Sequence, residues 1–382
     1  MMNLLLKNGA IVTGDKEFSG DILIKNGGIQ KIGGTISDRT AEVCDLGGRI
    51  VIPAFIDIHI HGADGADTMD NSLESLKKIS AFAARHGVAN FLPTTLTGPQ
   101  DVLMEVLEKI ADLQDTDLPG ANIFGVHMEG PYFDMEYKGA QNAKYIKVST
   151  VNEIKKFLRV KKNLVKLFSL SPNNEEALES IRFLREKGVV VSVGHSACVY
   201  EKVKKGIEAG IRHATHTFNG MRGFNHREPG VVGAILEDPA VKAEIIFDKI
   251  HVHPAMVHLL IKIKGVENVI CITDSMSAAG LSDGDYKLGE LDVYVKDGVV
   301  RLATYDSLAG SILTMDSAFR NLLELGWSMA DAIRMTSTNA AEEFGLNSGE
   351  IAPGKDADLT VLDNHNEVVM TVVKGRIKYK GI

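Results

Sequence analysis

The sequence predicts an α/β protein: a (β/α)₈ barrel of the TIM type with a small β-sandwich domain formed by both chain termini. Three observations predict this fold. The chain has 382 residues, which exceeds the roughly 250 that such a barrel typically needs. Eight short apolar segments alternate with amphipathic segments in the middle of the chain, as parallel strands covered by helices do. Both chain ends instead show strand and turn patterns.

The composition excludes several classes of protein. Hydrophobic residues make up 45% and charged residues 24% of the chain, which argues against an intrinsically disordered protein. The net charge of −8 argues against a general nucleic-acid-binding surface, so we expect no nucleic-acid partner. No stretch approaches the ~18 apolar residues that span a bilayer, so we expect no membrane partner. Three scattered cysteines without a CxxC motif favour a cytoplasmic protein.

The two chain ends are predicted to fold together. Short strand-like runs alternate with turn-forming residues in the first fifty residues, and the last thirty residues look similar. Asn-Gly between apolar runs predicts a hairpin, because both residues tolerate positive φ. We therefore predict a β-sandwich domain from residues 1–53 and 353–382, with the catalytic barrel at 54–352. The expected strands are 4–7, 21–25, 29–32, 358–362, 367–373 and 376–379, and the expected early turns are Asn8-Gly9, Thr13-Gly14 and Asn26-Gly27-Gly28.

The barrel elements follow from residue spacing. Continuous apolar runs predict strands that are buried on both faces, and apolar residues spaced three or four apart predict the helices. An open doubly wound sheet would carry a glycine-rich nucleotide loop after its first strand, but this strand runs into Asp57, His59 and His61 instead. The expected strands are 54–60, 88–93, 123–128, 165–170, 189–193, 211–214, 243–247 and 269–272, and the expected helices are 73–86, 102–113, 151–158, 175–187 and 200–209.

Polar side chains follow five of these apolar strands, at the ends where barrel active sites lie. His59 and His61 are two residues apart on a strand, so both can face one cation. Imidazole and carboxylate ligands suit zinc, iron or manganese, and a purely structural polar core is the alternative. Asp274 stands where a base would take a proton from water and return it to a leaving group. The other polar residues at strand ends are His127, Glu129, His195, His213 and His216.

Ordered motifs along the chain resemble those of the amidohydrolase superfamily. PAFIDIHIHG at 53–62 resembles its opening motif, and PGKDADL at 353–359 resembles its closing motif. Further matching motifs are HMEGPYF at 127–133, GHS at 194–196, HATHTFNGM at 213–221, HREPG at 226–230, ITDSM at 272–276 and LAGS at 308–311.

The resemblance implies a fold and a reaction. The fold is a metal-dependent (β/α)₈ barrel with a small β-sandwich. The reaction is hydrolysis of the N-acetyl group of N-acetyl-D-glucosamine 6-phosphate to D-glucosamine 6-phosphate and acetate. The alternatives are deacetylation of N-acetylgalactosamine 6-phosphate, hydrolysis of another N-acyl amide, and a non-catalytic descendant, which would be expected to have lost metal ligands.

The resemblance also implies roles for the metal ligands and the catalytic residue. Glu129, His195 and His216 match the metal ligands, and His59 and His61 match a second metal site that Glu129 would bridge. We therefore expect one or two divalent ions per subunit, zinc or iron. The residue that matches the catalytic acid and base is Asp274.

The remaining implied roles concern the substrate, an amino-sugar phosphate. Arg227 and His251 match phosphate-binding positions, one of which comes from the neighbouring subunit, so a homodimer with shared phosphate sites is implied. His226 could line the phosphate pocket or cap a loop. Gln141 replaces a substrate-binding His of many relatives; it can donate a hydrogen bond but carries no charge. The other expected substrate contacts are Asn219, Gly220, Leu308, Ala309 and Gly310.

Overall fold

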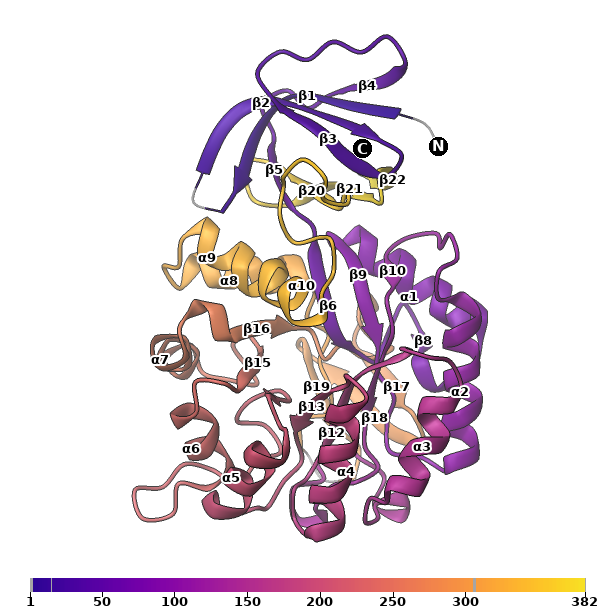
Figure 1. Cartoon of the computed structure of the whole chain (residues 1–382), viewed down its shortest axis with the longest axis vertical. Coiled ribbons are helices and arrows are strands. Elements are labelled where there is room, and N and C mark those ends of the chain that lie inside the picture. The colour runs from indigo at the N-terminus through magenta and orange to yellow at the C-terminus, as the bar shows by residue number, and fades with distance from the viewer. Residues whose placement is uncertain (1–2, 15, 305–306, 382) are drawn as a thin grey trace.

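The computed structural model describes residues 3–14, 16–304 and 307–381. A barrel surrounded by helices occupies one end of the molecule, and strands from both termini form a layer at the other end (Figure 1). Three C-terminal helices lie between the barrel and this layer (Figure 1). They are α8 (Met315–Glu324), α9 (Met329–Ile333) and α10 (Asn339–Phe344), with a π-helical turn at Arg334–Thr338.

Eight parallel strands form the barrel, as the alternating pattern predicts. Regular ladders pair β6 with β9, to which the short strand β10 (Asn122–Ile123) is added, and join the other six barrel strands into a second sheet. Isolated bridges from Thr94 to His127 and from Ile60 to Ser275 join the two sheets at both edges, so the ring closes. The predicted fold class is therefore confirmed. The strands are β6 (Phe55–Ile60), β9 (Val88–Pro93), β11 (Val126–Glu129), β12 (Val165–Leu170), β13 (Val190–Val193), β14 (His213–Ala214), β15 (Lys242–Ile246) and β16 (Val269–Ile272).

Two predicted barrel strands differ in extent. The run at 123–128 is divided into β10 (Asn122–Ile123), which pairs with β9, and β11, which pairs with β12. The chain thus changes partner within one apolar run, and Gly125 lies at the change. A Cβ on Gly125 would meet the Cγ of Lys166 at 2.3 Å, so this close approach favours glycine. The run at 211–214 is a strand only at its last two residues.

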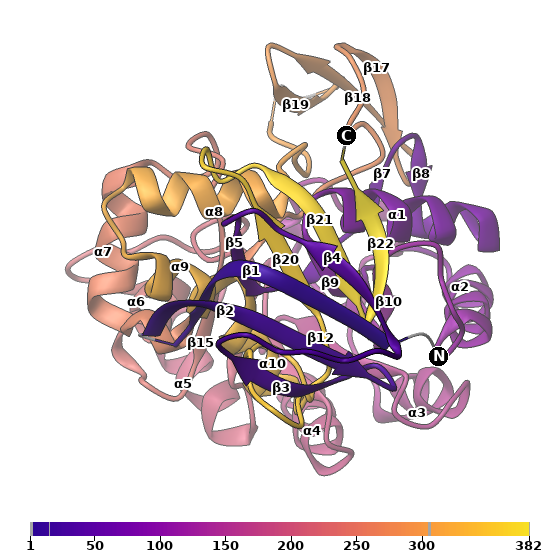
Figure 2. The ribbon, with the colours of Figure 1, turned by 90° about the horizontal axis from the view of Figure 1, so that it is seen from above.

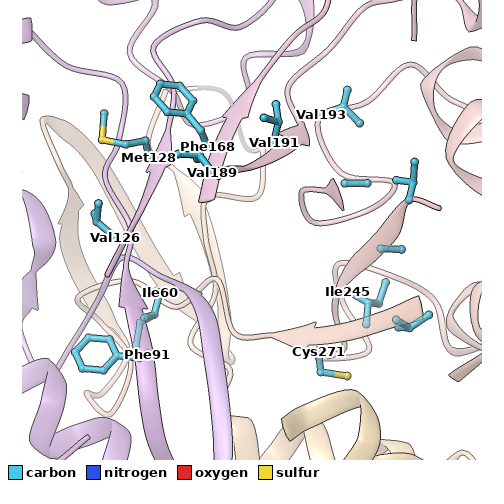
Figure 3. Packing of buried hydrophobic residues seen from close by; sticks show 14 of the residues in the cluster. Ile60, Phe91, Val126, Met128, Phe168, Val189, Val191, Val193, Ile245 and Cys271 are labelled. Atoms are coloured by element: carbon cyan, nitrogen blue, oxygen red, sulfur yellow. The ribbon is translucent and has the colours of Figure 1, made fainter. Parts of the chain in front are cut away.

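Helices cover the outside of the barrel and bury their apolar faces against it. In α1, for example, Leu76, Ile79 and Ala83 are buried at spacings of three and four residues. Figure 3 shows buried apolar side chains that the barrel strands contribute to this core, among them Phe91 and Phe168, which are both fully buried. Each side chain of this size contributes about 1.5–3 kcal/mol when buried. The helices are α1 (Leu73–Arg85), α2 (Gln100–Leu113), α3 (Val151–Arg159), α4 (Glu175–Glu186), α5 (Tyr200–Ala209), α6 (Gly230–Glu237) and α7 (Pro254–Lys264).

Both chain ends contribute to one eight-stranded sheet, as predicted. The N-terminal part joins the C-terminal part where β5 pairs with β20. Viewed from above, the strands from the two termini cross the top of the barrel together (Figure 2). The division at residues 53 and 353 stays a prediction, and its outer limits, residues 1 and 382, lie outside the described residues. The strands are β1 (Asn3–Thr13), β2 (Lys16–Lys25), β3 (Gly28–Gly33), β4 (Ala41–Asp45), β5 (Ile50–Pro53), β20 (Leu359–Leu362), β21 (Val368–Val373) and β22 (Arg376–Lys380).

The predicted hairpin at Asn8-Gly9 is wrong. Strand β1 continues through both residues, and its register with β2 shifts between Leu6 and Gly9. Asn8 has a φ of 55°, and its backbone N–H donates to Asp21 Oδ1 at 3.0 Å, so the positive φ serves a bulge rather than a turn. The predicted turn at Asn26-Gly27 does join β2 to β3.

A three-stranded antiparallel sheet after β16 has no counterpart in the sequence prediction. Its strands are β17 (Gly284–Leu288), β18 (Leu291–Lys296) and β19 (Val299–Leu302). No helix within the described ranges is long and apolar enough to cross a membrane. The remaining short elements are the two-residue strands β7 (Gly62–Ala63) and β8 (Ala66–Asp67) and the 3₁₀ turns Thr68–Asp70, Met135–Tyr137, Ala143–Tyr145 and Val266–Asn268.

Candidate active site

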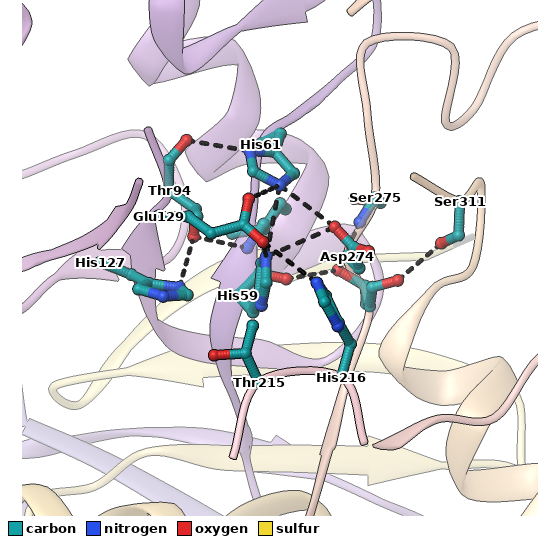
Figure 4. Close-up of polar contacts among 12 residues, drawn as sticks. His59, His61, Thr94, His127, Glu129, Thr215, His216, Asp274, Ser275 and Ser311 are labelled. Atoms are coloured by element: carbon teal, nitrogen blue, oxygen red, sulfur yellow. Dashed lines mark hydrogen bonds and ion pairs between the residues drawn. The ribbon is translucent and has the colours of Figure 1, made fainter. Parts of the chain in front are cut away.

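Six polar side chains from five barrel strands meet at the carboxyl ends of those strands. Figure 4 labels all of them except His195. They come from β6 and from the ends of β11, β13, β14 and β16. Each is at least nine-tenths buried, although an apolar core would not need such side chains. The six residues are His59, His61, Glu129, His195, His216 and Asp274, and the sequence predicted all of them as site residues.

Glu129, His195 and His216 form the first potential metal-binding group. Glu129 Oε1 lies 3.1 Å from Nε2 of each histidine, and the two Nε2 atoms are 3.2 Å apart. The Nδ1 atom of His195 donates to the carbonyl of Tyr137 at 2.9 Å, and Nδ1 of His216 donates to the carbonyl of Asn219 at 3.0 Å. Because these bonds place the ring protons on Nδ1, both Nε2 lone pairs face the carboxylate.

His59, His61 and Asp274 form the second group. The two Nε2 atoms are 3.3 Å apart and lie 3.4 and 3.1 Å from Asp274 Oδ1. Glu129 also faces this group, because its Oε2 lies 3.4 Å from His61 Nε2. Nδ1 of His61 donates to the carbonyl of Thr94 at 3.2 Å, and Nδ1 of His59 donates to Glu244 Oε2 at 3.0 Å. All four ligand imidazoles therefore present Nε2 to one centre.

This donor set fits divalent metal ions. Neutral imidazoles with their Nε2 lone pairs 3.2–3.3 Å apart repel one another unless a cation lies between them. Nitrogen and carboxylate oxygen ligands without thiolates suit zinc or iron and are typical of catalytic rather than closed structural sites. The hydrogen bonds on Nδ1 fix the ring orientations, as such bonds do around known metal sites.

The two central carboxylates stay ionised despite their burial. Burial raises the pKa of Glu129, but the positive charge that its histidine neighbours, His59 first, carry without a bound cation outweighs it and holds the pKa well below its usual value. A bound cation would supply this positive charge in place of the ring protons. Burial also raises the pKa of Asp274, but His59 and His61 outweigh this effect and lower the pKa below its usual value. Both carboxylates are therefore available as metal ligands, and Asp274 can accept a proton.

Three of these residues have a strained backbone. His195, His216 and Asp274 have φ values of 45°, 30° and 49°, in the left-handed region that L-residues rarely adopt. Such conformations cost of order 1–3 kcal/mol each and concentrate at functional sites. Two backbone hydrogen bonds of 2.8 Å hold Asp274: its N–H donates to the His59 carbonyl, and its carbonyl accepts from Ser311 N–H.

A cavity of about 240 Å³ is lined by five of the six side chains, and only His59 lies behind them without lining it. Gln141 lines the cavity, and its side-chain hydrogen bonds hold Glu129 in place. Its Nε2 donates to Glu129 Oε2 at 2.7 Å, and its Oε1 accepts from Thr97 N–H at 2.8 Å. Ala309 is buried beside the cavity without lining it and packs in an apolar cluster with Met276. The other predicted substrate residues that line the cavity are Asn219, Gly220, His251, Leu308 and Gly310.

The structure does not bring His226 and Arg227 to this cavity. Both side chains are exposed in the loop before α6, and neither lines the cavity of the same chain. Arg227 makes a local contact, in which its backbone N–H donates to Asn225 Oδ1 at 3.0 Å. His251 does line the cavity, and its Nδ1 lies 2.6 Å from Asp248 Oδ2. The predicted phosphate contacts are therefore divided between the cavity and an outer loop.

Sequence reasoning missed Glu244, which is fully buried behind the site. Its Oε2 accepts from Nδ1 of His59 at 3.0 Å and from the backbone N–H of His216 at 2.9 Å. Its Oε1 lies 3.0 Å from Nε2 of His213. The available signal was a charged residue inside the apolar run 243–247, because a strand buried on both faces has no place for an unpartnered carboxylate.

This architecture, with its paired metal-binding groups, is that of metal-dependent hydrolases, and comparison with known proteins identifies the class. The amidohydrolase family model matches residues 50–378. The chain therefore belongs to the amidohydrolase family, as its motifs predicted.

Relatives matched over most of their length show which members of this family the chain resembles. The chain is 34% identical to N-acetylglucosamine-6-phosphate deacetylase of Lysinibacillus sphaericus, with 99% of this chain and 98% of the relative covered. It is 37% identical to N-acetylgalactosamine-6-phosphate deacetylase of Escherichia coli O157:H7, with 91% of each chain covered. A Mycobacterium smegmatis N-acetyl-D-glucosamine-6-phosphate deacetylase variant, solved in complex with N-acetyl-D-glucosamine-6-phosphate, is 30% identical with a TM-score of 0.93 and covers 100% of both chains.

Proposed function

We propose that this protein hydrolyses the N-acetyl amide of N-acetyl-D-glucosamine 6-phosphate to D-glucosamine 6-phosphate and acetate. The observation that carries the proposal is the convergence of two potential metal-binding groups at one cavity, with Glu129 of the first group 3.4 Å from His61 of the second and with Asp274 beside them. Full-length similarity to deacetylases of amino-sugar phosphates supports the substrate class. An intact ligand set disfavours a non-catalytic descendant.

Bound metal ions and side chains would have different roles in this reaction. Glu129, His195, His216, His59 and His61 would hold the divalent ions, which when bound would supply Lewis-acid chemistry for an amide carbonyl and a water molecule. We propose zinc or iron, at one or two ions per subunit. Gln141 holds Glu129 in place through its 2.7 Å hydrogen bond, so it acts on the ligand carboxylate.

Asp274 performs the proton transfers in this proposal. Its ionised carboxylate accepts a proton from the attacking water, whose oxygen forms a bond to the acetyl carbon. The C–N bond then breaks, and Asp274 returns the proton to the amine nitrogen. Without this proton the amine would leave as a high-energy anion. The net reaction consumes one water and releases acetate and the amino sugar.

We also propose that the protein is a homodimer in which Arg227 reaches the cavity of the partner subunit. Arg227 and His226 are exposed and do not line the cavity of their own chain, whereas a guanidinium suits bidentate phosphate binding. An exposed apolar patch near this loop supports a second copy of the chain as the partner that covers it. The loop leads into α6, and α6 packs against α7, which carries most of the patch. The patch consists of Phe224, Ile250, Met256, Leu259 and Ile263, which are 40–67% exposed.

Mixing two impaired variants, assayed at a sugar-phosphate concentration well below the KM of Arg227→Ala, tests the shared site. In Asp274→Asn the proton acceptor is lost, and in Arg227→Ala the phosphate contact is lost. If Arg227 acts across the interface, a mixed dimer contains one site with both native residues, and random mixing restores about a quarter of all sites. Recovery of acetate release after co-refolding or co-expression is expected. An absence of recovery in dimers shown to be mixed would contradict the shared site.

The substrate proposal is tested by acetate release from both epimeric sugar phosphates and from their unphosphorylated forms. Metal content is measured on the same sample. Deacetylation of N-acetylgalactosamine 6-phosphate is the second candidate, favoured by the 37% identical relative that acts on this epimer. We expect a preference for N-acetyl-D-glucosamine 6-phosphate, and a metal-loaded sample that releases acetate from neither phosphate would refute the proposal. We place the protein in the cytoplasm, whose reducing conditions suit its three free cysteines.

A further inference from the structure

A chain of alternating carboxylates and imidazoles runs from His59 away from the cavity. Glu244 Oε2 lies 3.0 Å from His59 Nδ1, and Glu244 Oε1 lies 3.0 Å from His213 Nε2. Glu343 Oε1 continues the chain at 3.1 Å from His213 Nδ1. The side chains of the first three residues are fully buried, and that of Glu343 is 8% exposed. The four residues come from β6, β15, β14 and α10, so only the folded barrel assembles them.

The hydrogen bonds of this chain determine which nitrogen of His59 carries the proton. His213 lies between two carboxylates and donates from both ring nitrogens. Burial alone lowers the pKa of His213, but Glu343 and Glu244 outweigh it and raise the pKa to about 10. Glu244 is left as an acceptor, which takes hydrogen bonds from the backbone N–H of His216 and from His59. The His59 proton therefore stays on Nδ1, and its Nε2 lone pair faces His61 and Asp274.

His59 differs in this respect from the other three ligand histidines. Nδ1 of His61, His195 and His216 donates to neutral backbone carbonyls at 2.9–3.2 Å. Only His59 among the four donates to a carboxylate, Glu244. Hydrogen bonds with an ionised partner are roughly twice as strong as neutral ones, and such a partner makes the imidazole a better metal ligand. Glu244 thus supports an imidazole of the second metal group directly, whereas in the first group it contacts only the backbone N–H of His216 and no imidazole.

We propose that Glu244, held by His213 and Glu343, is a positioning residue that orients His59 and thereby determines retention of the second divalent ion. The proposal deepens the proposed function, because it rests on the same pair of metal groups. Its direct consequence is an unequal effect on the two groups: loss of the Glu244 charge should weaken binding at His59 and His61 while leaving Glu129, His195 and His216 loaded.

Metal binding by purified full-length variants tests the proposal without any use of deacetylase activity. Wild type, Glu244→Gln and Glu343→Gln are equilibrated with a series of buffered free Zn²⁺ concentrations, and bound zinc per folded subunit is measured by mass spectrometry. We expect two ions in wild type. In Glu244→Gln the dissociation constant of the second ion should rise about 10–100-fold, as is typical when a partner of a metal-ligating histidine is lost. The first ion should bind as in wild type.

A matched control separates this effect from the general loss of a buried charge. Asp358 is a buried carboxylate directly before β20 of the terminal sheet, where it accepts from Asn90 Nδ2 at 2.8 Å and from Lys374 N–H at 2.7 Å. Asp358→Asn should bind both ions as wild type does. His61→Gln provides the one-ion reference, because it removes a ligand of the second group.

Several results would overturn the proposal. They are an unchanged second dissociation constant in Glu244→Gln, an equal weakening of both ions, the same weakening in Asp358→Asn, or a wild type that binds one ion at most. If Glu244→Gln does not fold, Glu343→Gln provides the test, because the Glu343 carboxylate contacts neither metal group. This variant should show a smaller loss of affinity, confined to the second ion. A failure of the deacetylase assay with this metal pattern intact would reject the proposed substrate alone.

Discussion

Replacement of Asp274 by Asn tests the proton-transfer role most directly, because the structure predicts that the backbone tolerates the change. The φ of 49° at this position suits Asn as well as Asp, since both adopt the left-handed region more readily than other residues. The two 2.8 Å backbone hydrogen bonds to His59 and Ser311 do not involve the side chain. The variant should therefore fold and differ from wild type mainly by one lost negative charge.

The expected loss of rate follows from the position of this carboxylate. Asp274 Oδ1 lies 3.1 Å from His61 Nε2 and 3.4 Å from His59 Nε2, so the carboxylate faces the metal groups, and an amide cannot accept the water proton there. General acid–base catalysis contributes about 10²–10⁴ in rate, so kcat should fall by that factor, or about 3–5 kcal/mol of barrier. The second metal group also loses a ligand, so the second ion should bind more weakly.

Acetate release is measured at saturating substrate and saturating zinc, with bound metal determined on the same sample. Asp67→Asn is a suitable control, because Asp67 is a buried carboxylate that lines a neighbouring cavity and not the active one. We expect the control to keep kcat within a few-fold of wild type. If Asp274→Asn keeps more than a tenth of the wild-type kcat while folded and loaded, the assignment of proton transfer to Asp274 is refuted.

Three further predictions concern the phosphate, the metal and acid stability. Arg227→Ala should raise KM for the sugar phosphate about 10–100-fold, because a charge-assisted hydrogen bond contributes about 1.5–3 kcal/mol. It should leave the KM for unphosphorylated N-acetylglucosamine unchanged. Equal losses on both substrates would contradict the phosphate role. Dialysis against a chelator should lower the unfolding temperature, because the ions bind only the folded site, and added zinc or iron should restore it; an unchanged temperature would argue against the metal groups. Asp316, whose carboxylate lies 3.1 Å from both His86 Nδ1 and Arg320 Nη1, has its pKa lowered from 3.8 to about 2 even though burial opposes this. Its stabilisation is thus present above pH 3.8 and is lost as pH falls through 2, so Asp316→Asn should cost about 2 kcal/mol of unfolding free energy at pH 7 and about half that at pH 3; a pH-independent cost in urea titrations would contradict it.

The two metal groups show how much of a site can be predicted from strand patterns in the sequence. His59 and His61 could be assigned to one cation because the two-residue period of a strand is local. Glu129 and His216, whose side chains lie 3.1 Å apart, are 87 residues apart in sequence. Their meeting could be predicted only because parallel strands in a barrel end at the same face. The apolar runs thus predicted the neighbourhood of the ligands, while barrel closure determined their distances.

Other features had no local signal of sufficient strength. Asn8-Gly9 has the composition of a hairpin turn, yet the pairing of β1 with β2 extends past it and turns the positive φ into a bulge. The sheet formed by β17, β18 and β19 was not predicted, although its Leu288 lines the active cavity. In both cases partner strands decided the outcome, and a single segment does not identify its partners.

The sequence by itself determined the α/β class, the order of the barrel strands, the joining of both termini and the residues of the two potential metal-binding groups, because periodicity and motif spacing are properties of the chain. Only the tertiary structure placed Glu244 behind His59 and left Arg227 outside the cavity of its own chain. The physical reason is that burial creates the need for partners. A carboxylate in a buried strand requires donors, and barrel closure brings them from β6 and β14, which lie far away in the sequence.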